Sequence, residues 1–243
     1  MDTNNVTFTA NKIWLSKESK SAPSPIIKTI PEWYSKADRF AKSPSNDYII
    51  GPDKGKIPTW KACPAIFDIM GTGYSFNTPC DIEFYKKHGK TLFNISNKKY
   101  ESFVAHRDEM PEFQHPLGYS KDHFAWTPDW QIRLPEGYSA LYSQPFNRFE
   151  LPFLSTSGII DNDKLHNPGS LPFFLIDNFE GVIPAGTPYI QILPFKRENW
   201  TSEILEQSDS IQIIKDHMDV TAKYRKPDGG VYKNEVWERR KYE

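Results

Sequence analysis

Residues 157–195 carry the pattern that most restricts the fold of this chain, because short apolar runs alternate there with tight turns. The run 158–160 (GII) leads into an acidic turn at 161–163 (DND), and the turn 184–186 (PAG) leads into an apolar run at 189–195. Short apolar runs bounded by glycine, proline and aspartate are typical of β-strands. The stretch therefore predicts a β-barrel or β-sandwich, in which a ligand could be held between two turns.

Composition supports a mainly β protein and excludes one class of partner. The 243 residues include 20 prolines and 14% aromatic residues, more than a helical protein carries. The length suits one large β domain with additions. The formal net charge of -1 provides no basic surface for phosphate backbones, so we expect no nucleic-acid partner.

Targeting signals and cysteines point to a cytosolic protein. The amino terminus has neither a basic start nor an apolar segment, and no window approaches the about 18 apolar residues that cross a bilayer. We therefore expect no membrane partner and a cytoplasmic location. Cys63 and Cys80 are too few for a disulfide framework, and we expect two buried free thiols.

Three segments differ in character. Residues 1–62 read as a proline-rich extended arm, residues 63–200 as the β domain, and residues 201–243 as a helical and charged extension. A short helix is expected from Pro64, and apolar residues recur at helical spacing between 199 and 224. The arms, with tryptophans at 14, 33 and 60, predict a homo-oligomer.

Residues 130–200 resemble an uncharacterised family of phage and bacterial proteins, a domain of unknown function. The resemblance rests on WQIRLPEGYSALYSQPFNR, SGIIDND and GVIPAGTPYIQILPFKRENW, and it extends back to about Thr59 through KACPAIFDIMGTGYSFNTPCDIEF. It implies a phage or bacterial protein of the cytosol, in the bacterial host if the protein is phage-encoded, and it gives no activity; association with the virion is left open.

More distantly, four segments are similar to the trimeric dUTPase and dCTP deaminase superfamily, which has a β-clip fold. The resemblance places ligand-binding or catalytic roles on TPCDIEF (Asp81), LPEGYSALYSQPFNR (Asn147 and Arg148), SGIIDND (Asp161) and PAGTPYIQI (Gly186 and Gln191). It implies a trimer that binds a nucleotide with Mg, in which Asp161 orients the attacking water. The chain departs from the family pattern, because the Arg-Ser-Ser segment that holds phosphates is missing.

The residues themselves offer two interpretations of the acidic turn. Asp161 and Asp163 follow a strand and could be presented to a pocket as a working carboxylate pair. Alternatively, Asp-Asn-Asp is an ordinary turn sequence whose side chains bond nearby backbone.

Two further constellations carry chemistry. His106, Asp108 and His166 are candidates for a 2-His-1-carboxylate site with Fe(II). The basic residues near strand ends could bind an anion, or could pair with Glu136, Glu150 and Glu198 instead; they are Arg133, Arg148, Lys196 and Arg197.

Three functional hypotheses follow. The first is a phage-like accessory protein on a dUTPase-related β scaffold that binds a nucleotide-like or small anionic ligand, with catalysis left open. The second is a virion-associated or other structural protein whose aromatic arm docks on a neighbour. The third is a non-haem Fe(II) oxygenase.

Overall fold

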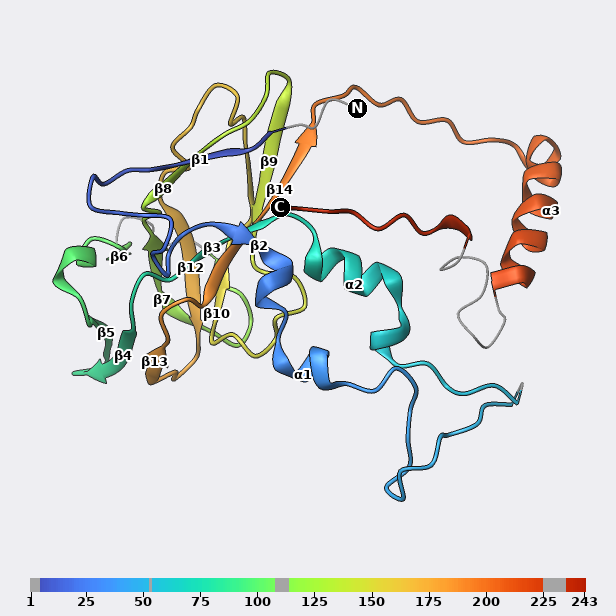
Figure 1. Cartoon of the computed structure of the whole chain (residues 1–243), viewed down its shortest axis with the longest axis horizontal. Helices are drawn as coiled ribbons and strands as arrows, with labels where there is room; N and C mark the ends of the chain where they lie inside the picture. The colour runs from blue at the N-terminus through green and yellow to red at the C-terminus, as the bar shows by residue number, and fades with distance from the viewer. Residues whose placement is uncertain (1–4, 53, 108–113, 225–234) are drawn as a thin grey trace. The chain divides into compact units, whose positions relative to one another are not determined.

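A computed structural model describes residues 5–52, 54–107, 114–224 and 235–243 of the chain (Figure 1). The chain divides into two compact units. The first, which we call the β unit, comprises Met1–Thr29, Thr72–Arg197 and Tyr242–Glu243. The second unit comprises Ile30–Gly71 and Glu198–Lys241.

All named strands belong to the β unit, and every pairing between them is antiparallel. In the described part of the chain they form four sheets. Their orders are β1(Thr7–Ala10)-β8(Trp130–Arg133); β10(Phe153–Ser155)-β12(Leu171–Ile176)-β7(Tyr119–Trp126)-β6(Val104–His106); β11(Gly158–Ile160)-β9(Tyr138–Ser143)-β14(Pro188–Lys196)-β3(Tyr74–Asn77)-β2(Ser24–Pro25); and β13(Gly181–Ile183)-β4(Ile82–Lys87)-β5(Lys90–Ile95).

One aromatic core joins these sheets. The Trp126 indole of β7 stacks on the Phe173 ring of β12, with centroids 3.7 Å apart and an interplanar angle of 8°. Trp126 also approaches Tyr189 of β14, at 5.1 Å between centroids, and Phe173 meets the edge of Phe84 of β4. These large rings remove much apolar area from water, and they explain how short strands hold together.

The second unit contains helices and loops. Its helices are α1(Glu32–Lys36), the 3₁₀ turn η2(Trp60–Ala62), α2(Pro64–Gly71) and α3(Gln207–Tyr224). Thr59 caps η2, because its side chain accepts a hydrogen bond from the Lys61 N–H. The β unit adds two 3₁₀ turns, η1(Ile26–Thr29) and η3(Lys98–Tyr100).

The mainly β fold class is confirmed, with antiparallel sheets, few helices and a C-terminal helix. The helix expected from Pro64 is α2, where proline occupies the first position and its missing N–H has no cost. The apolar run at 189–195 is β14, and the helical spacing beyond residue 199 corresponds to α3. Within the described ranges, no helix is long and apolar enough to span a bilayer.

Candidate functional site

The acidic turn that follows β11 holds an ion pair whose carboxylate is buried and whose arginine is partly exposed. The Asp163 side chain is only 4% exposed, and it accepts hydrogen bonds from the Gly137 N–H at 2.9 Å and from Arg197 Nη1 at 2.9 Å. A second contact joins Arg197 Nη2 to the other carboxylate oxygen. The hydrogen bonds from Arg197, with that of Gly137 and the positive charge, hold the pKa of Asp163 well below its usual range. At neutral pH Asp163 is therefore a charged acceptor that ties the turn to Arg197, the residue following β14.

Asp161 is the more accessible acid of this turn. Its side chain is 50% exposed, and Oδ1 accepts a hydrogen bond of 2.6 Å from the Ser139 hydroxyl. Arg197 Nη1 lies 3.4 Å from the same oxygen. Asp161 thus shares the guanidinium that binds Asp163, so this turn brings together both acids named from sequence around one arginine. Arg133 and Lys164 also line a pocket beside Asp163.

Asn162, between the two acids, anchors the turn and was missed by the sequence analysis. It is fully buried; its Oδ1 accepts from the Tyr142 hydroxyl at 3.0 Å, and its Nδ2 donates to the Leu165 carbonyl at 2.8 Å. Burial raises the pKa of Tyr142, which stays neutral and donates. The sequence signal for this role was an amide two residues after a strand.

Asp81 and Gly186 meet at another turn, the one between β13 and β14. Asp81 Oδ1 accepts from the Ala185 N–H at 2.8 Å, and the Gly186 N–H donates to the Thr78 carbonyl at 2.8 Å. Gly186 has φ of +84°, which favours glycine. Both residues stabilise the turn itself.

The two turns lie at opposite ends of β14. Its first residue pairs with Asn77, next to Thr78, while Phe195 pairs with Ser139, the partner of Asp161. β14 has nine residues, and at about 3.3 Å per residue its ends are about 26 Å apart. Within one chain, Asp81 and Asp161 therefore do not share one site.

Gln191, in the middle of β14, is fully buried, and its side-chain amide forms hydrogen bonds with backbone groups. Its Oε1 accepts from the Phe146 N–H at 3.0 Å, and its Nε2 donates to the Thr72 carbonyl at 2.7 Å. Gln191 thereby positions the loop that carries Asn147 and Arg148. Its role in this chain is to support that loop.

Asn147 and Arg148 line a pocket of about 430 Å³ in the β unit, together with aromatic side chains such as Phe149. Asn147 has φ of +58°. Arg148 is already engaged: its Nε pairs with Glu150, and Nη1 donates to the Thr29 carbonyl at 2.8 Å. An anion here would compete with Glu150 for the guanidinium.

The proposed iron ligands are only partly described. The His106 ring lies against those of Phe124 and Phe93, at 4.8 and 5.3 Å between centroids, and the His166 carbonyl accepts from the Ile132 N–H. Asp108 lies outside the described residues. Among residues that are described, no three histidine, cysteine or acidic side chains gather in a way that could hold a metal. The iron set stays a prediction.

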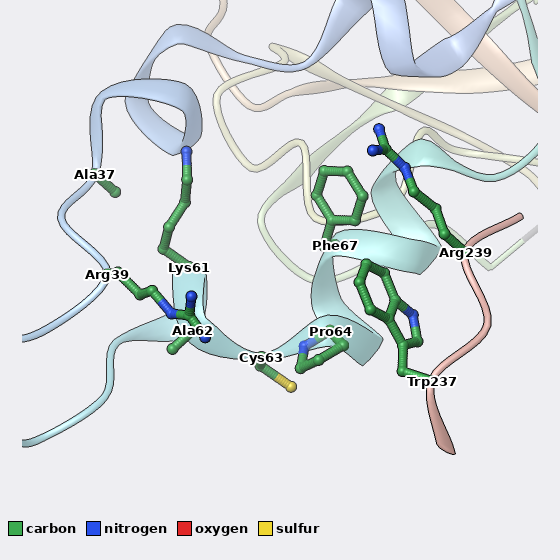
Figure 2. Close-up of a pocket in the computed structure, with 9 residues that line it drawn as sticks. All are labelled: Ala37, Arg39, Lys61, Ala62, Cys63, Pro64, Phe67, Trp237 and Arg239. Carbon is green, nitrogen blue, oxygen red and sulfur yellow. The ribbon is translucent and has the colours of Figure 1, made fainter. Parts of the chain in front are cut away.

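A different pocket, in the second unit, gathers cations with aromatic rings (Figure 2). We call it the Arg39 pocket. It has a volume of about 350 Å³, and its walls include Arg39, Lys61, Cys63, Phe67, Trp237 and Arg239. Three separate stretches of sequence build it: the segment after α1, the η2–α2 segment and the segment around residue 238.

The cations of the Arg39 pocket have no carboxylate partner among the described residues. Arg39 Nε is buried and makes no hydrogen bond, and its guanidinium lies 5.8 Å from the Phe40 ring centroid. Lys61 Nζ donates to the Tyr34 and Ser35 carbonyls at 2.7 and 2.8 Å. The pocket is therefore a place where positive charge is left uncompensated.

The expectation of two buried thiols is wrong for one cysteine. Cys80 is buried in the core of the β unit, whereas Cys63 is only partly buried and lines the Arg39 pocket. The residue lies between η2 and α2. The Arg39 pocket could not be predicted from the sequence, because its charged residues are far apart in the chain, at 39, 61 and 239. The aromatic residues near those positions were the only sequence signal for the pocket.

Comparisons with known proteins give a remote structural likeness. No protein-family model and no curated protein sequence matches the chain. Among solved structures, a mutant dUTPase of phage phi11 of S. aureus is similar, with 16% identity and a TM-score of 0.25. The matched region covers 42% of this chain and 95% of that one. At this distance, residue roles have to come from the geometry of this chain.

Proposed function

We propose that this protein binds a small anionic ligand in the Arg39 pocket. The observation that carries the proposal is the guanidinium of Arg39, whose Nε is buried without a hydrogen-bond partner. A buried donor left unpaired costs about 1–3 kcal/mol, and more when the group is charged. Protein atoms cover Nε itself, so an anion in the pocket acts on the rest of the guanidinium, whose charge has no carboxylate partner among the described residues.

The surrounding charges support an anion at this place. The nearby acid Asp68 is already engaged, since Oδ2 accepts from Trp237 Nε1 at 2.7 Å and from Arg240 at 3.2 Å. Asp38 pairs with Lys42 at 3.1 Å. In the β unit, by contrast, Arg148 and Arg197 are both neutralised by acids of the protein. Of these three arginines, Arg39 is thus the one whose charge has no acidic partner among the described residues.

The wider role that we propose is that of a phage-like accessory protein on a dUTPase-related β scaffold. Its support is the order of the sequence motifs, with Asp81, Asp161 and Gly186 on a mainly β unit. A nucleotide, with Mg as its counter-ion, is one member of the ligand class. Our proposal is binding, and no catalytic step is assigned to any residue.

Cys63 provides a direct test, because it lines the pocket while the other thiol is buried. The full chain is labelled with N-ethylmaleimide in the presence of inorganic phosphate, nucleoside monophosphates and small carboxylic acids. We expect at least one anion to slow Cys63 labelling and to raise Tm. Arg39→Gln abolishes both effects, and the matched variant Arg133→Gln, in the β unit, retains them. A flat response to every anion overturns the proposal.

A second candidate site is the pocket of Asn147 and Arg148, which the superfamily resemblance also indicates. Its volume of about 430 Å³ and its aromatic lining suit a nucleotide-like ligand. Asn147→Gly removes the side chain at a φ of +58°, which glycine adopts without strain. A nucleotide-induced rise in Tm that Asn147→Gly abolishes, without protection of Cys63, would favour this site over the Arg39 pocket.

We also propose a homo-oligomer, a trimer if the superfamily's assembly carries over. Its support is the exposure of aromatic arm residues: Trp60 is 56% exposed and Trp33 is 41% exposed. Sedimentation of the full chain and of the Trp33→Ser/Trp60→Ser variant tests this. We expect an oligomer that the variant weakens, and a monomeric wild-type chain at high concentration contradicts it.

A further inference from the structure

The walls of the Arg39 pocket are of two kinds. Figure 2 shows Arg39 and Lys61 on one side, the rings of Phe67 and Trp237 on the other, and Pro64 between them. A cationic wall and an aromatic wall thus face the same space of about 350 Å³.

The aromatic wall has a fixed geometry. Phe67 and Trp237 meet edge to face, with centroids 6.3 Å apart and an interplanar angle of 81°. The hydrogen bond from Trp237 Nε1 to Asp68 occupies the polar edge of the indole. Both rings are only partly buried, so apolar ring surface stays open to the pocket. A ligand ring added there gains a contact that is worth up to about tenfold in affinity.

The cationic wall suits a planar or tetrahedral oxyanion. The guanidinium of Arg39 is a rigid fork of donors, which matches two oxygens of a carboxylate or phosphate. Arg239 adds positive charge next to the ring, since its guanidinium lies 5.6 Å from the Phe67 centroid. An inorganic anion would pair with the cations and leave the protein's rings exposed to water. An uncharged aromatic ligand would cover those rings and leave the cations without a countercharge.

We infer that the ligand of the Arg39 pocket is an aromatic acid, in which one small planar ring system carries a carboxylate or a phosphate. Its anionic group lies at Arg39, and its ring lies on Phe67 and Trp237. The inference rests on the proposed function and specifies the ligand class. The volume supports it, because about 350 Å³ is near the lower end of ligand pockets, about 300–1,000 Å³.

The test compares ligands that differ in one feature, on the unmodified full chain. Indole-3-acetate and phenyl phosphate are the aromatic anions, indole-3-acetamide is the neutral counterpart, and acetate and inorganic phosphate lack the ring. Affinity is measured by calorimetry, and occupancy of the pocket is measured by protection of Cys63. We expect the aromatic anions to bind about tenfold more tightly than either their neutral or their ringless counterparts.

Two variants separate the walls. Arg39→Gln is expected to abolish the preference for indole-3-acetate over indole-3-acetamide, because it removes the cation. Trp237→Leu is expected to abolish the preference for indole-3-acetate over acetate, because it removes the aromatic ring. Arg133→Gln, in the β unit, changes neither preference. Acetate or phosphate binding as tightly as the aromatic anions overturns the inference and leaves the proposed function standing. Equal binding of acid and amide, or no protection of Cys63 by any anion, overturns both.

Discussion

Replacing Tyr142 by phenylalanine tests whether the acidic turn belongs to the scaffold. The substitution removes one oxygen atom from a side chain that is fully buried, and it leaves the ring that packs in the core. Asn162 Oδ1, which accepts from this hydroxyl at 3.0 Å and is itself fully buried, then loses its donor. A buried acceptor without a partner costs about 1–3 kcal/mol, so we expect a loss of unfolding free energy in that range.

Urea denaturation measures this loss as a lower midpoint at unchanged slope. Tyr48→Phe is the control, because Tyr48 is 46% exposed and a change there should stay within about 0.5 kcal/mol. In a double-mutant cycle with Asn162→Ala, the two losses should fall short of additive by about 0.5–3 kcal/mol. Additive losses, or a Tyr142→Phe midpoint equal to that of the control, would refute the anchoring role of Asn162.

Alkaline pH provides a second measurement on the same pair. Burial raises the pKa of Tyr142 in the folded protein, whereas the unfolded chain has the ordinary value of about 10. Below that pH both states hold the proton and stability is complete. Above it the unfolded chain releases the proton first, so stability falls as pH rises toward the folded pKa. Tyr142→Phe should make this fall less steep, and an unchanged slope would contradict the assignment.

Three further outcomes follow from the structure. Gly73→Ala should lower the free energy of unfolding by about 2–5 kcal/mol in urea denaturation, because a Cβ there would lie 2.1 Å from a β14 carbonyl oxygen and Gly73 has φ of +85°. Gly118 has φ of +83° but open space around it, so Gly118→Ala should lower that free energy by only about 1–2 kcal/mol. Equal losses for the two variants would contradict the clash at Gly73. The lowered pKa of Asp163 contributes stability above pH about 4 that is lost as pH falls, so Asp163→Asn should flatten the acid limb of a stability profile. In the native protein Cys63 should react with maleimide much faster than Cys80, as mass spectrometry would show.

The local parts of the fold were predictable because their signals are local. The alternation of apolar and polar residues at 82–84 lies in strand β4, where burial alternates in the same way, since side chains of a strand point to opposite faces every second residue. Proline at the start of α2 needs no partner for a missing N–H. Such patterns act over a few residues, and tertiary contacts did not override them.

Side-chain partners depended on contacts between distant residues. Asp163 is held by Arg197, 34 residues away, and the sequence offered only an open choice between a ligand site and a turn. Gln191 is a similar case, because its amide serves the backbone at Thr72 and Phe146. Strand pairing, which sequence patterns do not specify, decides which of these side chains meet.

The sequence by itself determined the fold class and the places of the main strands and helices, because these follow from composition and short periodicities. Only the tertiary structure decided which charges are compensated. It neutralised Arg148 and Arg197 with acids of the β unit. It placed Arg39 in one pocket with Phe67 and Trp237, and none of the described acids pairs with Arg39. Charge compensation depends on distances of a few ångströms between side chains, and a linear sequence does not contain them.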